Sequence, residues 1–198
     1  PAGPSEVEVI ADESANPAFI AADFLSQAEH GVDSQAMLVT ASESIVEPVM
    51  QAIREQLDRL PRKEITEKSL SHSRLIVLKD KQEVIDFTNL YAPEHLIIQT
   101  TDYTDIAGLV ENAGSVFMGP YTPESAGDYA SGTNHTLPTN GYAKAYNGVN
   151  LDSFIKKITF QEITADGIRL LGGTIRTMAA NEQLDAHKNA VTIRLNTL

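Results

Sequence analysis

Short apolar runs alternate with helical patterns over the first two-thirds of the chain. The runs that predict strands lie at residues 7–10, 36–39, 75–78, 96–98 and 116–118. The patterns that predict helices between them lie at residues 17–30, 45–57, 81–91 and 103–112. Strands that alternate with helices are joined by crossover connections, so we expect an α/β fold with a mainly parallel sheet.

Two local signals mark where helices begin. Asn16 and Pro17 suit an N-cap and a first helical position, and Gly31 is placed to end the same helix. Ser44 and Glu47 have the spacing of a capping box. We therefore expect one helix to begin at Pro17 and the next to begin beside Ser44.

The alternation stops at residues 119–148, which contain five glycines and three prolines without apolar periodicity. A long irregular stretch in a compact domain is usually functional or disordered, and the presence of Asp128 and His135 favours function. Beyond residue 150 the pattern predicts a helix, a short strand at residues 158–163, and helices to the end. Two domains are expected: an α/β domain over residues 1–149 and a small, mostly helical tail over residues 150–198.

Charge and composition exclude several classes of protein. The formal net charge of −12 argues against nucleic-acid and anionic-membrane partners. The chain has no cysteine, which excludes disulfides, thiolate zinc sites and cysteine nucleophiles within it. No apolar run reaches the length that spans a bilayer and no signal peptide is visible, so a cytoplasmic protein is expected. The chain begins with Pro1 rather than methionine, and we expect a piece of a longer protein.

Histidines are the candidates for acid–base or metal chemistry near neutral pH. The chain has five of them: His30, His72, His95, His135 and His187. Gln27 lies three residues before His30, so both side chains share one face of the last helical turn. His72 lies between two serines with no supporting residues, and a plain surface role is the simplest interpretation for it.

Two further stretches combine acidic residues with histidine. Glu94 and His95 follow a helix that Pro93 terminates, and in a turn both can converge on a pocket. A glutamate there could activate water, while the histidine takes a substrate proton. Asp128 and His135 offer an oxygen and a nitrogen ligand in the glycine-rich stretch.

The last pair, Glu182 and His187, lies five positions apart in the sequence, so on a helix the two side chains would point about 140° apart. They can serve one site only if that site wraps around the helix, or if the helix starts near Glu182. The candidate ligands together are oxygen and nitrogen donors, which suit zinc, cobalt or manganese. No G-x-G-x-x-G or Walker A sequence indicates a nucleotide site.

These motifs, in this order, resemble those of the histidinol dehydrogenase family. The resembling stretches are residues 1–7, 21–31, 91–96, 114–119, 124–135 and 182–187. The resemblance covers essentially the whole chain and implies that it corresponds to the C-terminal half of a family member. It also implies an incomplete Rossmann-like sheet with flanking helices, followed by the helical tail.

The resemblance implies roles for individual residues. It makes Glu94 and His95 the acid–base pair of the reaction. The zinc ligands are implied to be Gln27, His30, Asp128 and His187. Contacts to the substrate are implied for Ser5, His135 and Glu182, and the substrate also ligates the metal. The family often has glycine where Gln183 stands, between Glu182 and Leu184, and this departure puts only the local packing in question.

The reaction implied by the resemblance oxidises L-histidinol through histidinal to L-histidine and uses two NAD⁺. In this family the tail that carries Glu182 and His187 comes from the other subunit of a swapped homodimer. The NAD contacts are implied to lie largely in the N-terminal half, which this chain lacks. We therefore expect the chain alone to bind zinc without turning over histidinol.

Two alternatives belong to other functional classes. One is a non-catalytic, zinc-binding interaction fragment, which would need no NAD-binding half. The other is a metal-dependent hydrolase with Glu94 as the base toward water, which would act without nicotinamide and without His95.

Overall fold

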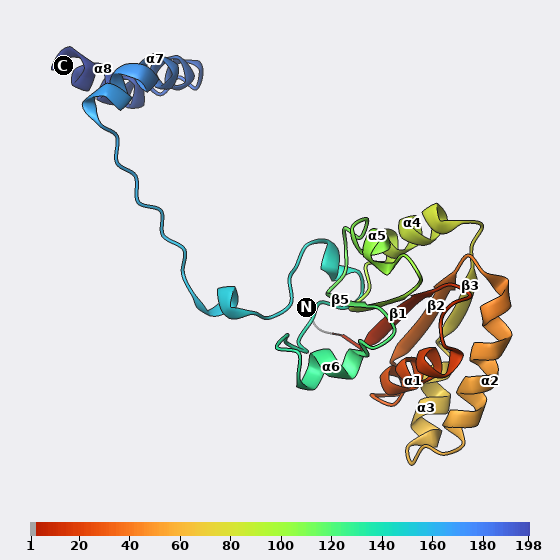
Figure 1. The fold of residues 1–198 in the computed structure, drawn as a ribbon. Coiled ribbons are helices and arrows are strands. Elements are labelled where there is room, and N and C mark those ends of the chain that lie inside the picture. The colour runs from red at the N-terminus through yellow and green to blue at the C-terminus, as the bar shows by residue number, and fades with distance from the viewer. Residues whose placement is uncertain (1–2) are drawn as a thin grey trace. The chain divides into compact units, whose positions relative to one another are not determined.

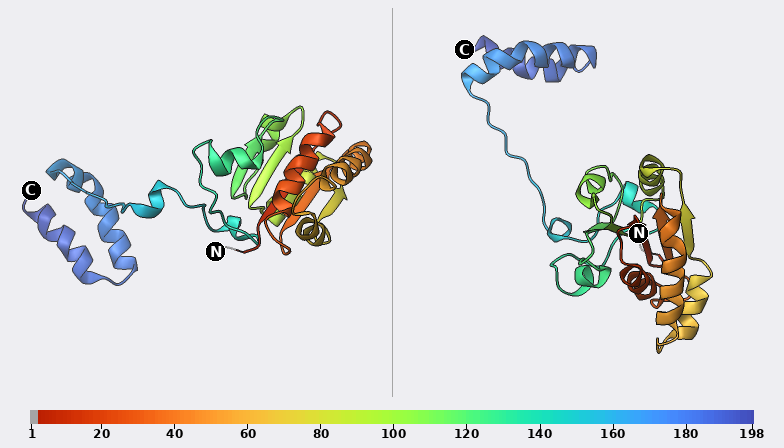
Figure 2. Two further views of the ribbon diagram at one scale, coloured as in Figure 1. Left: turned by 90° about the horizontal axis from the view of Figure 1, so that it is seen from below. Right: turned by 45° about the vertical axis from the view of Figure 1, so that its right-hand side comes forward.

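The computed structural model describes residues 3–198 and divides the chain into two compact units, Pro1–Phe154 and Ile155–Leu198. The first unit carries the sheet, and the second is a pair of helices (Figures 1 and 2). Among the described residues, no helix combines the length and the apolar character needed to cross a membrane.

The first unit is built on a five-stranded sheet in the order β3-β2-β1-β4-β5, with every neighbouring pair parallel. Its strands are β1 (Glu6–Ala11), β2 (Gln35–Thr40), β3 (Arg74–Val77), β4 (His95–Gln99) and β5 (Ser115–Met118). The predicted α/β fold with a mainly parallel sheet is confirmed. The three central strands are buried along almost their whole length, as parallel strands covered on both faces are.

Helices cover both faces of the sheet (Figure 1). One face packs against α1 (Pro17–Ala28), α2 (Val46–Leu57) and α3 (Lys63–Leu70), in a core that includes Phe24 and Val49. The other face packs against α4 (Lys81–Tyr91) and α5 (Tyr103–Ala107), in a second core that includes Val84. The sheet is therefore the middle layer of three.

The start of α1 follows the sequence signal, whereas the start of α2 does not. The Asn16 side chain accepts a hydrogen bond from the N–H of Ala18 at 2.9 Å, and Pro17 is the first helical residue. The predicted capping box at Ser44 is wrong, because a 3₁₀ turn (Glu43–Ile45) precedes α2 and no side chain caps that helix. Helix α1 ends at Ala28, and its C-cap is Glu29 in a right-handed conformation. The end of the helix therefore does not require the glycine that was expected at Gly31.

The glycine-rich stretch is not structureless. It contains α6 (Glu124–Tyr129) and the 3₁₀ turn η2 (Tyr142–Lys144), and a further turn, η3 (Leu151–Phe154), follows it. Six residues that include a glycine and a serine have a low intrinsic helix propensity, which is why the pattern did not reveal α6. The sequence pattern therefore does not predict the helix that carries Asp128.

The second unit is a helical hairpin of α7 (Ala165–Asn181) and α8 (Asp185–Asn196). The strand predicted at residues 158–163 is wrong, because that segment has no regular structure. A Cβ on Gly172 would lie 2.7 Å from a methyl carbon of Leu195, so this glycine allows the two helices to approach closely. Several large apolar side chains of the hairpin are exposed, among them Leu170, Met178 and Ile193.

A carboxyl group is buried in the middle of the sheet. Glu8 of β1 is fully buried, the hydroxyl of Thr88 in α4 donates to its Oε1, and its Oε2 has no partner within the described chain. Burial raises the pKa of Glu8 to about 8. The native state therefore favours the protonated form.

Glu8→Gln should stabilise the chain at alkaline pH. The carboxyl has a raised pKa in the folded state, so its contribution is complete below the ordinary value of 4.5 and is lost as the pH rises towards about 8. The loss is at most about 5 kcal/mol. An amide does not ionise and can still accept from Thr88. In urea unfolding at pH 8 we expect the variant to gain about 1 kcal/mol or more over the wild type. Parallel stability profiles for the two proteins between pH 4.5 and 8 would contradict this account.

Candidate metal and active site

Three elements meet at the amino-terminal edge of the sheet. Helix α1 starts after the carboxyl end of β1 and runs back, so its last turn, with Gln27, and the following His30 lie at the opposite edge. His95 is the first residue of β4 and lies in register with Val7 of β1. Helix α6 brings Glu124 and Asp128 to the same place. The end of α1 lies about 65 residues before the start of β4, which in turn lies about 30 residues before α6. Three segments distant in sequence therefore build one site.

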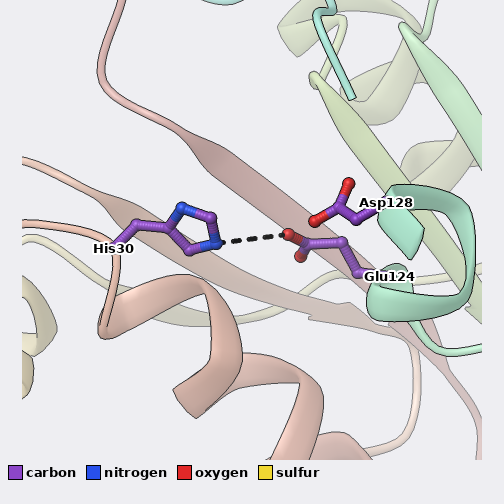
Figure 3. A group of neighbouring side chains, drawn as sticks. All are labelled: His30, Glu124 and Asp128. Atoms are coloured by element: carbon purple, nitrogen blue, oxygen red, sulfur yellow. Dashed lines mark ion pairs between the residues drawn. The ribbon is translucent and has the colours of Figure 1, made fainter. Parts of the chain in front are cut away.

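His30, Glu124 and Asp128 form a group whose potential ligand atoms all lie within 4.8 Å of one another. Figure 3 shows the imidazole facing the two carboxylates of α6. Nε2 of His30 is 4.0 Å from Oε1 of Glu124. The two carboxylates are four residues apart on α6, so they project from one face of that helix. We call this group the His30–Glu124–Asp128 cluster.

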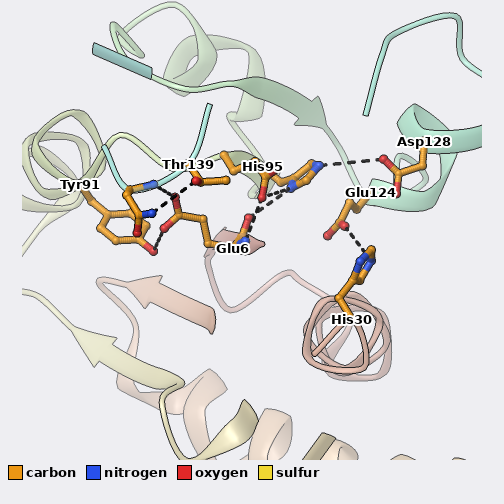
Figure 4. Close-up of polar contacts among 9 residues, drawn as sticks. Glu6, His30, Tyr91, His95, Glu124, Asp128 and Thr139 are labelled. Atoms are coloured by element: carbon orange, nitrogen blue, oxygen red, sulfur yellow. Dashed lines mark hydrogen bonds and ion pairs between the residues drawn. The ribbon is translucent and has the colours of Figure 1, made fainter. Parts of the chain in front are cut away.

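His95 lies beside this cluster (Figure 4), Glu94 is adjacent to His95, and both side chains are almost completely buried. Nδ1 of His95 is 3.2 Å from the carbonyl oxygen of Glu6 and 3.5 Å from Oε2 of Glu94. Because a carbonyl only accepts, Nδ1 carries the proton. Nε2 then points to the cluster, 4.0 Å from Oδ1 of Asp128. The geometry suits a histidine that exchanges a proton through Nε2.

Burial and charge shift the pKa values of this group in opposite senses. Burial raises the pKa of Glu124 to about 7, although the neighbouring His95 acts against the shift. Burial lowers the pKa of His95, but the hydrogen bond to Glu94 and the negative charge of Glu124 outweigh it and raise the value to about 9. The histidine and the carboxylates therefore balance one another's charge.

The residues present fit a divalent metal ion. Within the described chain, three buried side chains at or beside this edge have polar atoms with no hydrogen-bond partner: both amide atoms of Gln27, Oε2 of Glu124 and Nε2 of His95. Unpartnered buried polar atoms are rare in folded proteins and need an explanation such as a bound ion. The available donors are oxygens and imidazole nitrogens, which zinc accepts.

Close packing holds α6 against the sheet. The ring of Phe117 in β5 lies 5.9 Å from the ring of His95. A Cβ on Gly127 would lie 2.6 Å from Cε1 of Phe117, so only glycine permits this approach. At the start of β5 a Cβ on Gly114 would lie 2.5 Å from the carbonyl oxygen of Glu94. Both glycines let the chain come close to the pair Glu94 and His95.

Other predicted site residues lie outside this group. Ser5 is half-buried immediately before β1, and residues 1–2 of the same motif are outside the described residues. His135 is exposed in the loop after α6. Glu182 and His187 belong to the second unit, where both are exposed. The predicted contributions of Glu182 and His187 to the site stay predictions.

The turn between α7 and α8 explains two features of the sequence. Glu182 is the C-cap of α7, and α8 begins at Asp185, so Glu182 and His187 are not residues of one helix. Of the two geometries that the sequence left open, a helix starting near Glu182 is the one observed. Gln183 has a φ of 58°, which is the left-handed region. This conformation is easier for glycine than for glutamine.

Sequence reasoning did not single out Glu124. The signal available was its spacing of four residues from Asp128, but this spacing has meaning only if the segment is helical. Because the sequence pattern does not predict α6, it does not distinguish Glu124 from other polar loop residues. Its burial, which leaves the side chain only 2% exposed, came entirely from the tertiary structure.

The fold and the site define an α/β protein with an incomplete Rossmann-like sheet and a candidate metal centre beside a buried acid–base pair. The sequence model of the histidinol dehydrogenase family matches residues 1–195. The chain therefore belongs to the histidinol dehydrogenase family.

Individual relatives agree with this assignment. Histidinol dehydrogenase of Bacteroides thetaiotaomicron is 68% identical over 198 residues, and the chloroplastic histidinol dehydrogenase of Arabidopsis thaliana is 58% identical over 199. The crystal structure of histidinol dehydrogenase from Elizabethkingia anophelis matches with a TM-score of 0.93 and 57% identity. Each match covers 100% of this chain but only 46%, 43% and 46% of the respective relative. The chain thus spans less than half the length of these relatives.

Gly127→Ala should weaken metal binding. The added methyl group would meet the ring of Phe117 and displace α6 together with Glu124 and Asp128. We expect the affinity of the chain for zinc to fall about tenfold or more, since mutation of residues that hold metal ligands in place has effects of this order. Titration with a competing chelator measures the change. Gly173→Ala in α7 is the matched control, because nothing lies within 4 Å of its Cβ. Equal zinc affinities for the two variants would contradict the placement of α6 at the metal.

Proposed function

We propose that this chain supplies the metal- and substrate-binding half of an enzyme that oxidises L-histidinol through histidinal to L-histidine with two NAD⁺. Family membership supports the reaction, since the relatives are named histidinol dehydrogenases. The observation that carries the proposal within this chain is the meeting of the His30–Glu124–Asp128 cluster with Nε2 of His95.

The proposed zinc ligands in the first unit are Gln27, His30 and Asp128. The unpartnered amide of Gln27 and the proximity of His30 to Asp128 support this set. When bound, zinc would orient the substrate and polarise its oxygen or amine. Glu124 lies within the same cluster, and we propose that its carboxylate adds negative charge next to the cation.

The proposed proton transfers use His95 and Glu94. In the first oxidation the neutral form of His95, which becomes populated as the pH approaches its pKa of about 9, accepts the hydroxyl proton of the alcohol at Nε2 as the adjacent carbon loses hydride. Nicotinamide is the hydride acceptor in each oxidation, and we propose that its contacts lie outside this chain. In the second oxidation Glu94 removes a proton from the water that adds to the aldehyde, since the chain offers no cysteine for a covalent adduct.

We also propose that the site is shared between two chains in a homodimer. His187 would be the fourth zinc ligand, and Ser5, His135 and Glu182 would contact the substrate. The exposed apolar side chains of the helical hairpin support this arrangement, because such a surface favours burial against another surface. On this proposal the hairpin is exchanged with a partner copy. The proposed location is the cytoplasm.

Glu94→Gln should slow the oxidation of histidinal more than that of histidinol. Glutamine can keep the contact in which the N–H of Glu6 donates to Oε2 at 2.9 Å, so the main loss is the basic charge. Loss of a general base is worth about 10²–10⁴-fold in rate. Stopped-flow measurement of the two steps, in an enzyme of full family length that contains this chain, separates them. Equal losses in both steps would refute the water-activating role and favour a role in orienting His95.

Mixed dimers test the shared site. His187→Asn and Glu94→Gln each inactivate a homodimer on this proposal, but a heterodimer would contain one site with neither substitution. We expect differently tagged subunits of full family length, copurified as heterodimers, to regain up to about half of the wild-type turnover per dimer. Heterodimers verified by mass that show no activity would argue that each chain completes its own site.

A further inference from the structure

Glu6 is buried at the start of β1, next to His95 (Figure 4). Its main chain contacts both residues: the N–H of Glu6 donates to Oε2 of Glu94 at 2.9 Å, and its carbonyl oxygen is 3.2 Å from Nδ1 of His95. One peptide segment therefore sets the orientation of the carboxylate and the imidazole together.

The side chain of Glu6 is held at two points. The hydroxyl of Tyr91 donates to Oε2 at 2.6 Å, and the N–H of Asn140 donates to Oε1 at 2.5 Å. Tyr91 is the last residue of α4, and Asn140 lies in the loop that follows α6. Asn140 has a φ of 54°, a left-handed conformation that a specific partner helps to hold.

These contacts pin the short connection that leads into β4. Only Ala92 and Pro93 separate Tyr91 from Glu94, and Ala92 is itself left-handed with a φ of 57°. The carboxylate of Glu6 fixes the first end of this connection, and the N–H of Glu6 fixes the Glu94 end. A change at the Glu6 side chain would therefore alter the positions of Glu94 and His95 without altering the His30–Glu124–Asp128 cluster.

We propose that Glu6, held by Tyr91 and Asn140, is the positioning residue for the acid–base pair. This inference rests on the proposed roles of Glu94 and His95. It assigns to Glu6 no contact with substrate, since its carboxylate is turned to Tyr91 and Asn140. Its carbonyl keeps the proton of His95 on Nδ1, which leaves Nε2 as the atom that faces the reaction.

Glu8→Gln provides the matched control. Glu8 lies two residues along the same strand, points to the same face and is also buried, but its partner is Thr88 rather than any residue of the pair. Glu6→Ala removes both side-chain contacts, whereas Glu6→Gln keeps an oxygen that can accept from one donor.

The kinetic test uses an enzyme of full family length that contains this chain. We expect Glu6→Ala to lower kcat for histidinol about 100-fold, because small misplacement of a reacting group has effects of this order. KM should change less than about threefold and zinc content should stay the same, while Glu6→Gln recovers part of the rate and Glu8→Gln keeps all of it. A merely structural role would not separate kcat from KM or be rescued by glutamine.

A second measurement does not depend on activity. In the proton NMR spectrum of the 198-residue chain, the Nδ1–H of His95 should give a downfield resonance that exchanges slowly with water. We expect Glu6→Gln to broaden this resonance and Glu8→Gln to leave it unchanged. The comparison uses only conservative variants, so the test stays valid if Glu6→Ala does not fold. An unaltered resonance together with wild-type kcat in Glu6→Gln and Glu6→Ala would overturn the inference.

A control at His95 separates the two proposals. If His95→Gln abolishes turnover while both Glu6 variants remain fully active, the acid–base role stands and the positioning role fails. If His95→Gln retains full turnover, the acid–base role fails, and the positioning role fails with it.

Discussion

The buried carboxylate of Glu124 is the constraint around which the candidate site is organised. A carboxylate removed from water must be protonated, hydrogen-bonded or paired with a cation, because desolvation of an isolated charge costs several kcal/mol. Oε2 of Glu124 has no partner within the described chain, and Asp128 places a second carboxylate beside it. His30 and His95 supply the nearby nitrogen atoms. A divalent cation is the partner that this arrangement favours.

The position of the site departs from the usual rule for open parallel sheets, in which ligands bind outside the carboxyl ends of the strands. Here the site lies at the amino ends of β1 and β4, beside the C-terminus of α1. The C-terminal end of a helix carries partial negative charge and favours cations. The edge of the sheet that suits a metal ion is thus the one at which α1 ends, whereas the N-terminus of α1, which by its dipole favours anions, lies at the opposite edge.

The site also depends on backbone positions that carry no chemistry themselves. Gly127 and Gly114 permit close approach to Phe117 and to the carbonyl of Glu94, and Ala92 turns the chain into β4. The main chain of Glu6 then contacts Glu94 and His95. Because the contacts of Glu6 with Glu94 and His95 join segments 88 and 89 positions apart, the precision of the site comes from packing of the sheet and is sensitive to small changes in it.

The sequence by itself determined the five strands, most of the helices, and Gln27, His30, Glu94, His95 and Asp128 as candidates, since periodicity, capping and residue chemistry are local properties. It could not reveal α6, because a short glycine-containing helix has little intrinsic propensity, and the packing of Gly127 against Phe117 is a tertiary contact. Burial of Glu124 and the contacts of Glu6 with Tyr91 and Asn140 were likewise decided by the tertiary structure. Those interactions join residues 85 to 134 positions apart, and no local pattern in the sequence encodes such a meeting.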